Sequence, residues 1–193
     1  MNNTLRDSVP TTYIHDLSVN ERYSLFDDRS ENLSIPPLFS MLPVYERQLT
    51  DSAKFGALGT LLATGMMQTS LVRLPANSTF RKEIARRLHC FNDTAESLYN
   101  NLDLSLPVAS AQVALSALQA LPRSDHLRLR TFNRLQTFFA VMCYLLCAPT
   151  ASKGSLLAEA ICNEAVKNSD SFQLAFECAA DSAMNPGVKC HMF

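Results

Sequence analysis

Histidine and cysteine are the residue types in this chain that could ligate a metal or act as a nucleophile. The four histidines are His15, His89, His126 and His191. They do not form a His-Glu-x-x-His helix motif, and the chain has no phosphate-binding Gly-x-x-x-x-Gly-Lys loop, Gly-x-Ser-x-Gly elbow or dinucleotide-binding glycine fingerprint. We therefore interpret the histidines as surface or helix-end residues. The sequence predicts no metal, no other cofactor and no self-contained hydrolytic site.

The cysteines give no site signature either. They are Cys90, Cys143, Cys147, Cys162, Cys178 and Cys190. No two have the Cys-x-x-Cys spacing of a zinc or redox site. Cys143 and Cys147 are four residues apart in an apolar run, so they share one face of a predicted helix, where cysteine acts as a small buried hydrophobic residue. This pattern favours ordinary thiols in reducing surroundings, and hence a cytoplasmic location.

Arginine is the remaining residue type with a chemical role, because its guanidinium group binds carboxylates and phosphates. One basic cluster runs from Arg81 to Arg87, and the other contains Arg123, Arg128, Arg130 and Arg134. The simpler interpretation is two solvated helix faces. The functional alternative is a surface that meets an acidic partner or a bound nucleotide. The candidate partner-binding residues are then Arg81, Lys82, Arg86, Arg123 and Arg128.

The overall charge argues against nucleic acid as the partner. The formal net charge is -1, so the chain has no global positive field that would attract a phosphate backbone. Neither arginine cluster has the interleaved aromatic residues that stack on bases. The longest apolar run, residues 138–148, is shorter than the about 20 residues that cross a bilayer. We therefore expect neither a nucleic-acid partner nor a membrane span. The sequence does not identify the protein partner or the oligomeric state.

A chain of 193 residues is long enough for one domain with its own core. Residues 1–33 are polar without sustained periodicity, which predicts a flexible arm. Residues 34–182 are expected to form one helical domain, and residues 183–193 a loose tail after the breaker Asn185-Pro186-Gly187. No alternating strand runs joined by a tight turn are present. The fold class predicted is an all-α, multi-helix bundle.

Apolar residues at helical spacing place the helices. Helices are predicted over residues 38–49 (divided by Pro43), 80–88, 113–121, 125–147, 155–165 and 171–180. Ser78-Thr79 is expected to cap the second of these, with Phe80, Ile84 and Leu88 facing inward. Pro122 ends the third, and Ser124-Asp125 caps the fourth. The segment around Gly56, Gly59 and Gly65 fits either a helix with close backbone packing or a loop.

Four features occur in an order that resembles a known family. They are Ile35-Pro36-Pro37-Leu38 with Val44-Tyr45-Glu46, the segment 70–77 before the basic helix, the apolar helix 113–122, and the long helix with Ser152 to Ala158 downstream. Over roughly residues 35–165 they are similar to the GTPase-activating domain of Rho-family regulators, which is all-helical. In Ser70-Leu71-Val72-Arg73-Leu74-Pro75-Ala76-Asn77 the resemblance places an arginine-finger loop.

The resemblance implies a mechanism in which Arg73 reaches a small GTPase and stabilises charge that develops on the γ-phosphate, an effect of about 10³ to 10⁵ in rate. The family's glycine and aromatic residue before the finger are here Ser70 and Val72, and its two basic anchors on a later helix are Leu115 and Gln119. Two versions stay open. The domain stimulates GTP hydrolysis, or it is a degenerate domain that binds a GTPase without strong catalysis.

The alternative is a helical protein-interaction module with no enzymatic role, such as a bacterial effector or a viral accessory protein. The polar arm and the lack of site motifs favour it. Either way, the sequence predicts a regulator or binding protein rather than an enzyme with its own active site.

Overall fold

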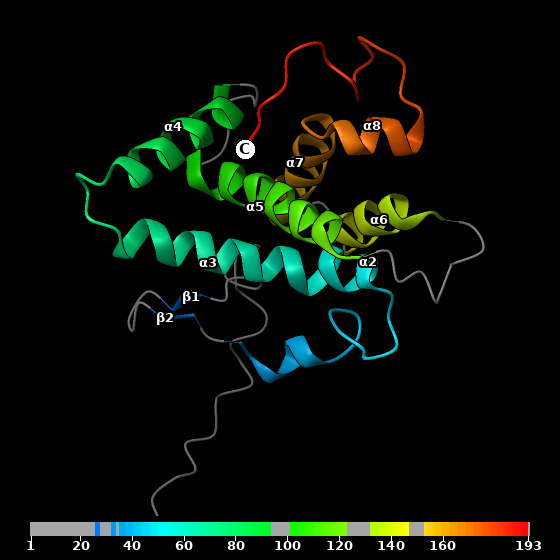
Figure 1. Cartoon of the computed structure of the whole chain (residues 1–193), viewed down its shortest axis with the longest axis horizontal. Coiled ribbons are helices and arrows are strands. Elements are labelled where there is room, and N and C mark those ends of the chain that lie inside the picture. Colours follow the sequence, from blue (N-terminus) through cyan, green and yellow to red (C-terminus); the bar gives the residue numbers. More distant parts are fainter. Residues whose placement is uncertain are drawn as a thin grey trace, which may run out of the picture.

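The computed structural model of the chain describes residues 26–27, 32–33, 35–93, 101–122, 132–146 and 153–192. Within these ranges the fold is a helical bundle, which confirms the all-α prediction (Figure 1). Its α-helices are α2 (Asp51–Lys54), α3 (Thr60–Arg73), α4 (Thr79–Asp93), α5 (Asn101–Ala120), α6 (Arg134–Leu146), α7 (Lys153–Lys167) and α8 (Asp170–Phe176). A 3-10 helix spans Pro37–Ser40, and a π-helical turn, Phe55–Gly59, joins α2 to α3.

Helix α5 is the centre of the bundle and packs against α3, α4 and α7 (Figure 1). Its apolar residues supply much of the main core, in which Val108 and Leu118 are fully buried together with Phe91 of α4 and Phe138 of α6. The predicted stop at Pro122 is confirmed, because α5 ends at Ala120. The helix starts earlier than predicted, however, and includes Pro107. Burial of the apolar residues before this proline outweighs the loss of one backbone hydrogen bond.

The prediction of a helix over residues 38–49 was wrong. The chain makes the 3-10 helix and then turns, with a cis peptide bond between Leu42 and Pro43. Pro43 has no backbone N–H and its ring clashes with a preceding helical turn, so the apolar spacing alone does not produce a helix here. The first regular helix begins instead after Thr50, whose hydroxyl caps it by accepting a hydrogen bond from the Ala53 N–H at 3.3 Å.

The glycine-rich segment is helical and packed closely. A Cβ atom added at Gly56 would lie 2.4 Å from the carbonyl oxygen of Phe138 in α6. The helix with close backbone packing is therefore the correct alternative, and Gly56 is the residue that permits it. At Gly59 an added Cβ would lie 3.4 Å from the Phe55 side chain, which is an ordinary contact.

This difference predicts opposite effects for two alanine substitutions. Gly56→Ala is expected to lower the free energy of unfolding by about 1–3 kcal/mol, because the methyl group forces α6 away. Gly59→Ala is expected to be neutral or to raise it by up to about 1 kcal/mol, since alanine favours the helix. Urea unfolding followed by circular dichroism measures both values. Equal midpoints for the two variants would contradict the close approach of the helices.

The continuous helical segment Asp51–Arg73 also has the length and composition of a membrane span. It has 23 residues and a mean hydropathy of 1.2 over its most apolar window, a third of which is buried inside the fold. Ala57, Leu61, Ala63 and Met67 are buried against the rest of the bundle. A core helix of a folded bundle accounts for the same composition.

Helix α4 confirms most of its predicted pattern. Ile84 and Leu88 are buried, and the Arg81 N–H donates to the Ser78 hydroxyl at 3.5 Å, as expected of a cap. Phe80 was predicted to face inward, but its exposed fraction is 61%. It lies in the first turn of α4, and Figure 1 shows this end of α4 at the edge of the bundle, away from α5.

Helix α6 shows both a confirmed and a revised prediction. The apolar residues Phe138, Phe139 and Met142 are buried as expected. Its first turn is capped by Asn133 and Gln136, each of which accepts the other's backbone N–H through its side-chain oxygen, at 2.9 and 3.0 Å. The cap predicted at Ser124-Asp125 lies outside the described residues, as does Leu127.

Four of the predicted free thiols are paired. Cys90 of α4 is bonded to Cys190, and Cys143 of α6 to Cys162 of α7. Cys178 is free, and Cys147 lies outside the described residues. The prediction failed because the paired cysteines are 100 and 19 residues apart, and only helix packing brings their Cα atoms to 5.8 and 5.2 Å. Free thiols therefore no longer support a cytoplasmic location, which stays a prediction.

The two ends of the chain differ from their predictions where they are described. Residues 1–25 of the predicted arm lie outside the described residues, whereas Phe26–Asp27 (β1) pairs antiparallel with Asn32–Leu33 (β2) beside α3. The loose tail over residues 183–193 was wrong, because Cys190 and Met192 are buried in the main core. Polar side chains of the helices bind the backbone of this segment, which apolar periodicity could not reveal.

Candidate functional site

The predicted arginine finger lies at the corner between two helices. Arg73 is the last residue of α3 and is exposed to solvent, and the loop 74–78 then leads into α4 (Figure 1). We call residues 70–82 the α3–α4 corner. The Leu74 N–H donates to the Ser70 carbonyl at 3.0 Å, so the helical hydrogen bonding continues to the edge of the loop. The Arg73 side chain therefore starts from a backbone that the helix fixes.

Hydrogen bonds hold the loop of this corner in one conformation. The Arg81 guanidinium donates through Nη1 to the Leu74 carbonyl at 2.9 Å, across the base of the loop. Within the loop, the Ser78 N–H donates to the Pro75 carbonyl at 2.9 Å. Arg81 is half-buried, and it serves to position the loop. Lys82, on the next position of α4, is exposed.

Exposed apolar side chains accompany Arg73 in this part of the chain. The exposed fractions are 45% for Val72 and 61% for Phe80, and Met66, two turns before the end of α3, is 59% exposed. Aromatic residues, methionine and arginine are the types enriched at the centres of protein interfaces. The corner thus combines the exposed Arg73 guanidinium with exposed apolar groups. It holds no pair of groups suited to general acid and base catalysis among the described residues.

Arg86 lies one turn further along α4 and is paired within the helix. It donates through Nε and Nη2 to the two carboxylate oxygens of Glu83, at 2.9 and 2.7 Å. Arg87 donates through Nε to the same carboxylate at 2.6 Å. The hydrogen bonds from Arg86 and then Arg87 lower the pKa of Glu83 from 4.5 to about 2. This pairing favours folding above pH 4.5 and is lost as the pH falls toward 2, because the unfolded chain binds the proton more readily.

Two predicted contact residues remain, together with the two positions where the Rho-type family has basic anchors. Arg123 and Arg128 lie outside the described residues. Leu115, at one of the two positions where the Rho-type family has a basic anchor, is buried in the core. Gln119, at the other, donates from its amide to the Ser171 hydroxyl at 2.9 Å and so links α5 to α8. Neither α5 position presents a positive charge beside Arg73.

A second candidate site lies beside α8, and most of its lining belongs to the segment predicted as a loose tail. It is an open cavity of about 520 Å³ lined by α8 and by the segment that follows it, with Asp170, Asp181, Asn185, Lys189 and His191 among the lining residues. Lys189 forms an ion pair with Asp170 at 2.5 Å, and this hydrogen bond lowers the pKa of the Asp170 carboxyl group. The pair neutralises the two charges that are closest to each other in the cavity.

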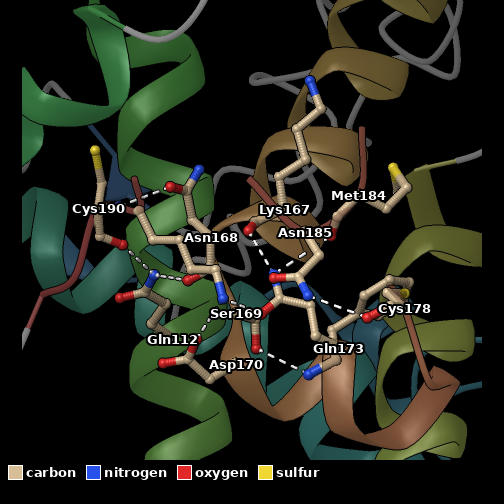
Figure 2. A network of polar contacts seen from close by, with 12 residues as sticks. Gln112, Lys167, Asn168, Ser169, Asp170, Gln173, Cys178, Met184, Asn185 and Cys190 are labelled. Carbon is tan, nitrogen blue, oxygen red and sulfur yellow. Dashed lines mark hydrogen bonds and ion pairs between the residues drawn. The ribbon is translucent and has the colours of Figure 1, made fainter. Parts of the chain in front are cut away.

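A network of amide side chains supports this second region (Figure 2). Figure 2 shows Gln112 of α5, Asn168 after α7 and Gln173 of α8 pointing toward the backbone that follows α8. Gln173 donates to the Lys167 carbonyl at 2.9 Å and the Met184 carbonyl at 3.3 Å. Isolated glutamines and asparagines carry no sequence signal for such a network. The signal that could have shown that the segment after α8 is anchored was Cys190, as a possible disulfide partner.

Neither site has the composition of a metal centre. In the described ranges no three residues among His, Cys, Asp and Glu are grouped so that they could hold an ion. The α3–α4 corner is an exposed surface with arginine and apolar side chains, and the cavity beside α8 is polar and open. The comparison of this chain with protein-family models, curated proteins and solved structures finds no match.

Proposed function

We propose that this chain is a protein-binding module whose α3–α4 corner contacts its partner, and that the partner is a small GTPase of the Rho type. The observation that carries the proposal is the exposed Arg73 at the end of a fixed helix, beside a loop that Arg81 holds in place. The resemblance of segment 70–77 to an arginine-finger loop supplies the partner class. An arginine on a rigid support loses little conformational entropy when it binds a phosphate or carboxylate.

Binding rather than strong catalysis is the version we favour. The positions of the family's two basic anchors hold a core leucine, Leu115, and Gln119, which bonds to α8. A guanidinium without those neighbours has less positive charge around it with which to stabilise the γ-phosphate. Val72 and Phe80 instead provide apolar area next to the arginine, and such area contributes to affinity.

The test is a binding measurement against a panel of Rho-type GTPases, each loaded with GDP or with a non-hydrolysable GTP analogue. Wild-type chain is expected to bind at least one of them in a saturable manner. Arg73→Ala and Phe80→Ala are each expected to weaken that binding by about tenfold or more, as interface hot spots do. Leu174→Ala is the control, because Leu174 is 80% exposed on α8, at the opposite side of the bundle from the corner (Figure 1).

A hydrolysis assay on the same panel separates the two versions of the proposal. If wild type accelerates GTP turnover and Arg73→Ala does not, the arginine acts as a finger. Equal rates for both proteins, with binding retained, leave the degenerate version. If wild type binds none of the GTPases, the proposed partner class is wrong. The alternative then remains, namely an interaction module without an enzymatic role that binds a different protein.

A further inference from the structure

The segment that follows α8 is a strap that crosses the bundle. We call residues 177–192 the C-terminal strap. It begins at Glu177, whose φ of 54° ends α8 in the left-handed region, and Figure 1 shows it passing from α8 back to the side of α4 and α5. The strap contains no helix, and its contacts with the bundle are concentrated near its end.

The end of the strap is held by side chains of three helical segments. Asn168 Oδ1 accepts the Cys190 N–H at 2.7 Å, and Gln112 donates from Nε2 to the Cys190 carbonyl at 2.8 Å. The Oε1 of Gln112 accepts the Met192 N–H at 2.8 Å, and Arg87 donates to the Met192 carbonyl at 2.6 Å. Each of these bonds requires the strap end to lie between α4, α5 and α7.

One covalent bond fixes this end to the bundle. Cys190 is 1% exposed and is bonded to Cys90 of α4, which is only partly buried. Met192 beside it is 6% exposed and belongs to the main core. The middle of the strap is different, because Val188 is 79% exposed and Gly187 is also open to solvent. The strap thus has exposed stretches along its length, although Met184 packs against the core, and it is tightly bound at its end.

From this arrangement we propose that Cys90–Cys190 is a redox latch, and that a dithiol reductant releases the C-terminal strap from an otherwise intact bundle. A thiolate of the reductant attacks the sulfur of Cys90, which is the more accessible of the two, and the S–S bond breaks. Cys190 leaves as a thiolate and takes up a proton. The second thiol of the reductant then displaces Cys90, so the reductant becomes a disulfide and the protein gains two electrons and two protons.

The bundle has a core that does not depend on the latch. Val108, Leu118 and Phe138 are fully buried, and all lie in α5 or α6. A second disulfide, Cys143–Cys162, ties α6 to α7 independently of the strap. Once Cys90–Cys190 is reduced, the strap end is held by hydrogen bonds that water can replace and by the burial of two side chains, Cys190 and Met192. The helices keep the apolar contacts of the rest of the core. Opening of the strap therefore precedes unfolding of the helices.

Hydrogen exchange of the full chain tests the latch, with the Cys190 and Met192 amides as reporters. The experiment uses Cys143→Ser/Cys162→Ser, in which the latch is the one disulfide between the described cysteines, before and after treatment with dithiothreitol. Reduction is expected to accelerate exchange of the two reporter amides by at least about tenfold, as local opening does, with amides of α3 and α5 unchanged. If the double variant does not fold, wild-type chain is treated in the same way, and the effect of reducing Cys143–Cys162 is taken from Cys90→Ser/Cys190→Ser treated with dithiothreitol.

The matched variant is Cys90→Ser/Cys190→Ser, which cannot form the latch but keeps Cys143–Cys162. Its reporter amides are expected to exchange as fast under oxidising conditions as those of the reduced protein, and dithiothreitol is expected to add nothing. Two results would overturn the proposal. In one, the reporter amides stay protected after reduction. In the other, all helices lose protection together, which would make the disulfide a staple of the whole fold.

Discussion

Replacing Phe138 by alanine is expected to lower the free energy of unfolding by about 3–5 kcal/mol. The side chain is fully buried in the main core and packs edge to face on Phe139, with ring centroids 5.2 Å apart. Its backbone carbonyl also lies against Gly56, so α6 cannot easily move inward to fill the space. The variant therefore loses the free energy gained by burying an aromatic ring, and it also has the cost of a cavity that persists.

Phe80→Ala is the control for this substitution. Phe80 is 61% exposed at the start of α4, so its removal is expected to change the free energy of unfolding by no more than about 0.5 kcal/mol. Urea unfolding followed by circular dichroism measures both variants. A Phe138→Ala protein as stable as Phe80→Ala would show that α6 does not pack in the core as described. The control also ensures that a binding defect of Phe80→Ala is not a folding defect.

Replacing Gln112 by leucine is expected to lower the free energy of unfolding by about 2–4 kcal/mol, since each buried polar group left without a partner costs about 1–3 kcal/mol. One amide group bonds three backbone groups that are all far from Gln112 in the sequence. It donates to the Asn168 carbonyl at 3.0 Å and the Cys190 carbonyl at 2.8 Å, and it accepts the Met192 N–H at 2.8 Å. Leucine has a similar volume but satisfies none of these groups.

Gln119→Leu is the matched control, because Gln119 lies two turns further along the same helix and makes one exposed hydrogen bond, to Ser171. Its loss is expected to change stability by less than about 0.5 kcal/mol. Thermal or urea unfolding compares the two variants. If both glutamines prove equally tolerant of leucine, the amide network of Figure 2 does not stabilise the strap end, and the latch would depend on the disulfide alone.

Particular elements show why some predictions held. Helix α4 was found from Ile84 and Leu88 at helical spacing after a Ser-Thr cap, and α5 ended where Pro122 required. These signals are local, since they depend on residues within one or two helical turns. Residues 38–49 show the limit of the same reasoning. Their apolar spacing suited a helix, but Pro43 interrupts it, and Phe39 and Val44 are the buried apolar residues among the side chains described there.

The candidate site divides in the same way. The sequence alone determined that the chain is helical and that it lacks the familiar catalytic motifs, and the family resemblance singled out Arg73. Tertiary packing decided that Arg81 bonds across the base of the loop and that Phe80 is exposed. It also brought Cys90 to Cys190 and Gln112 to Met192. Helical periodicity records which face of a segment is apolar, but not which distant segment covers that face, because that choice depends on how all the helices pack together.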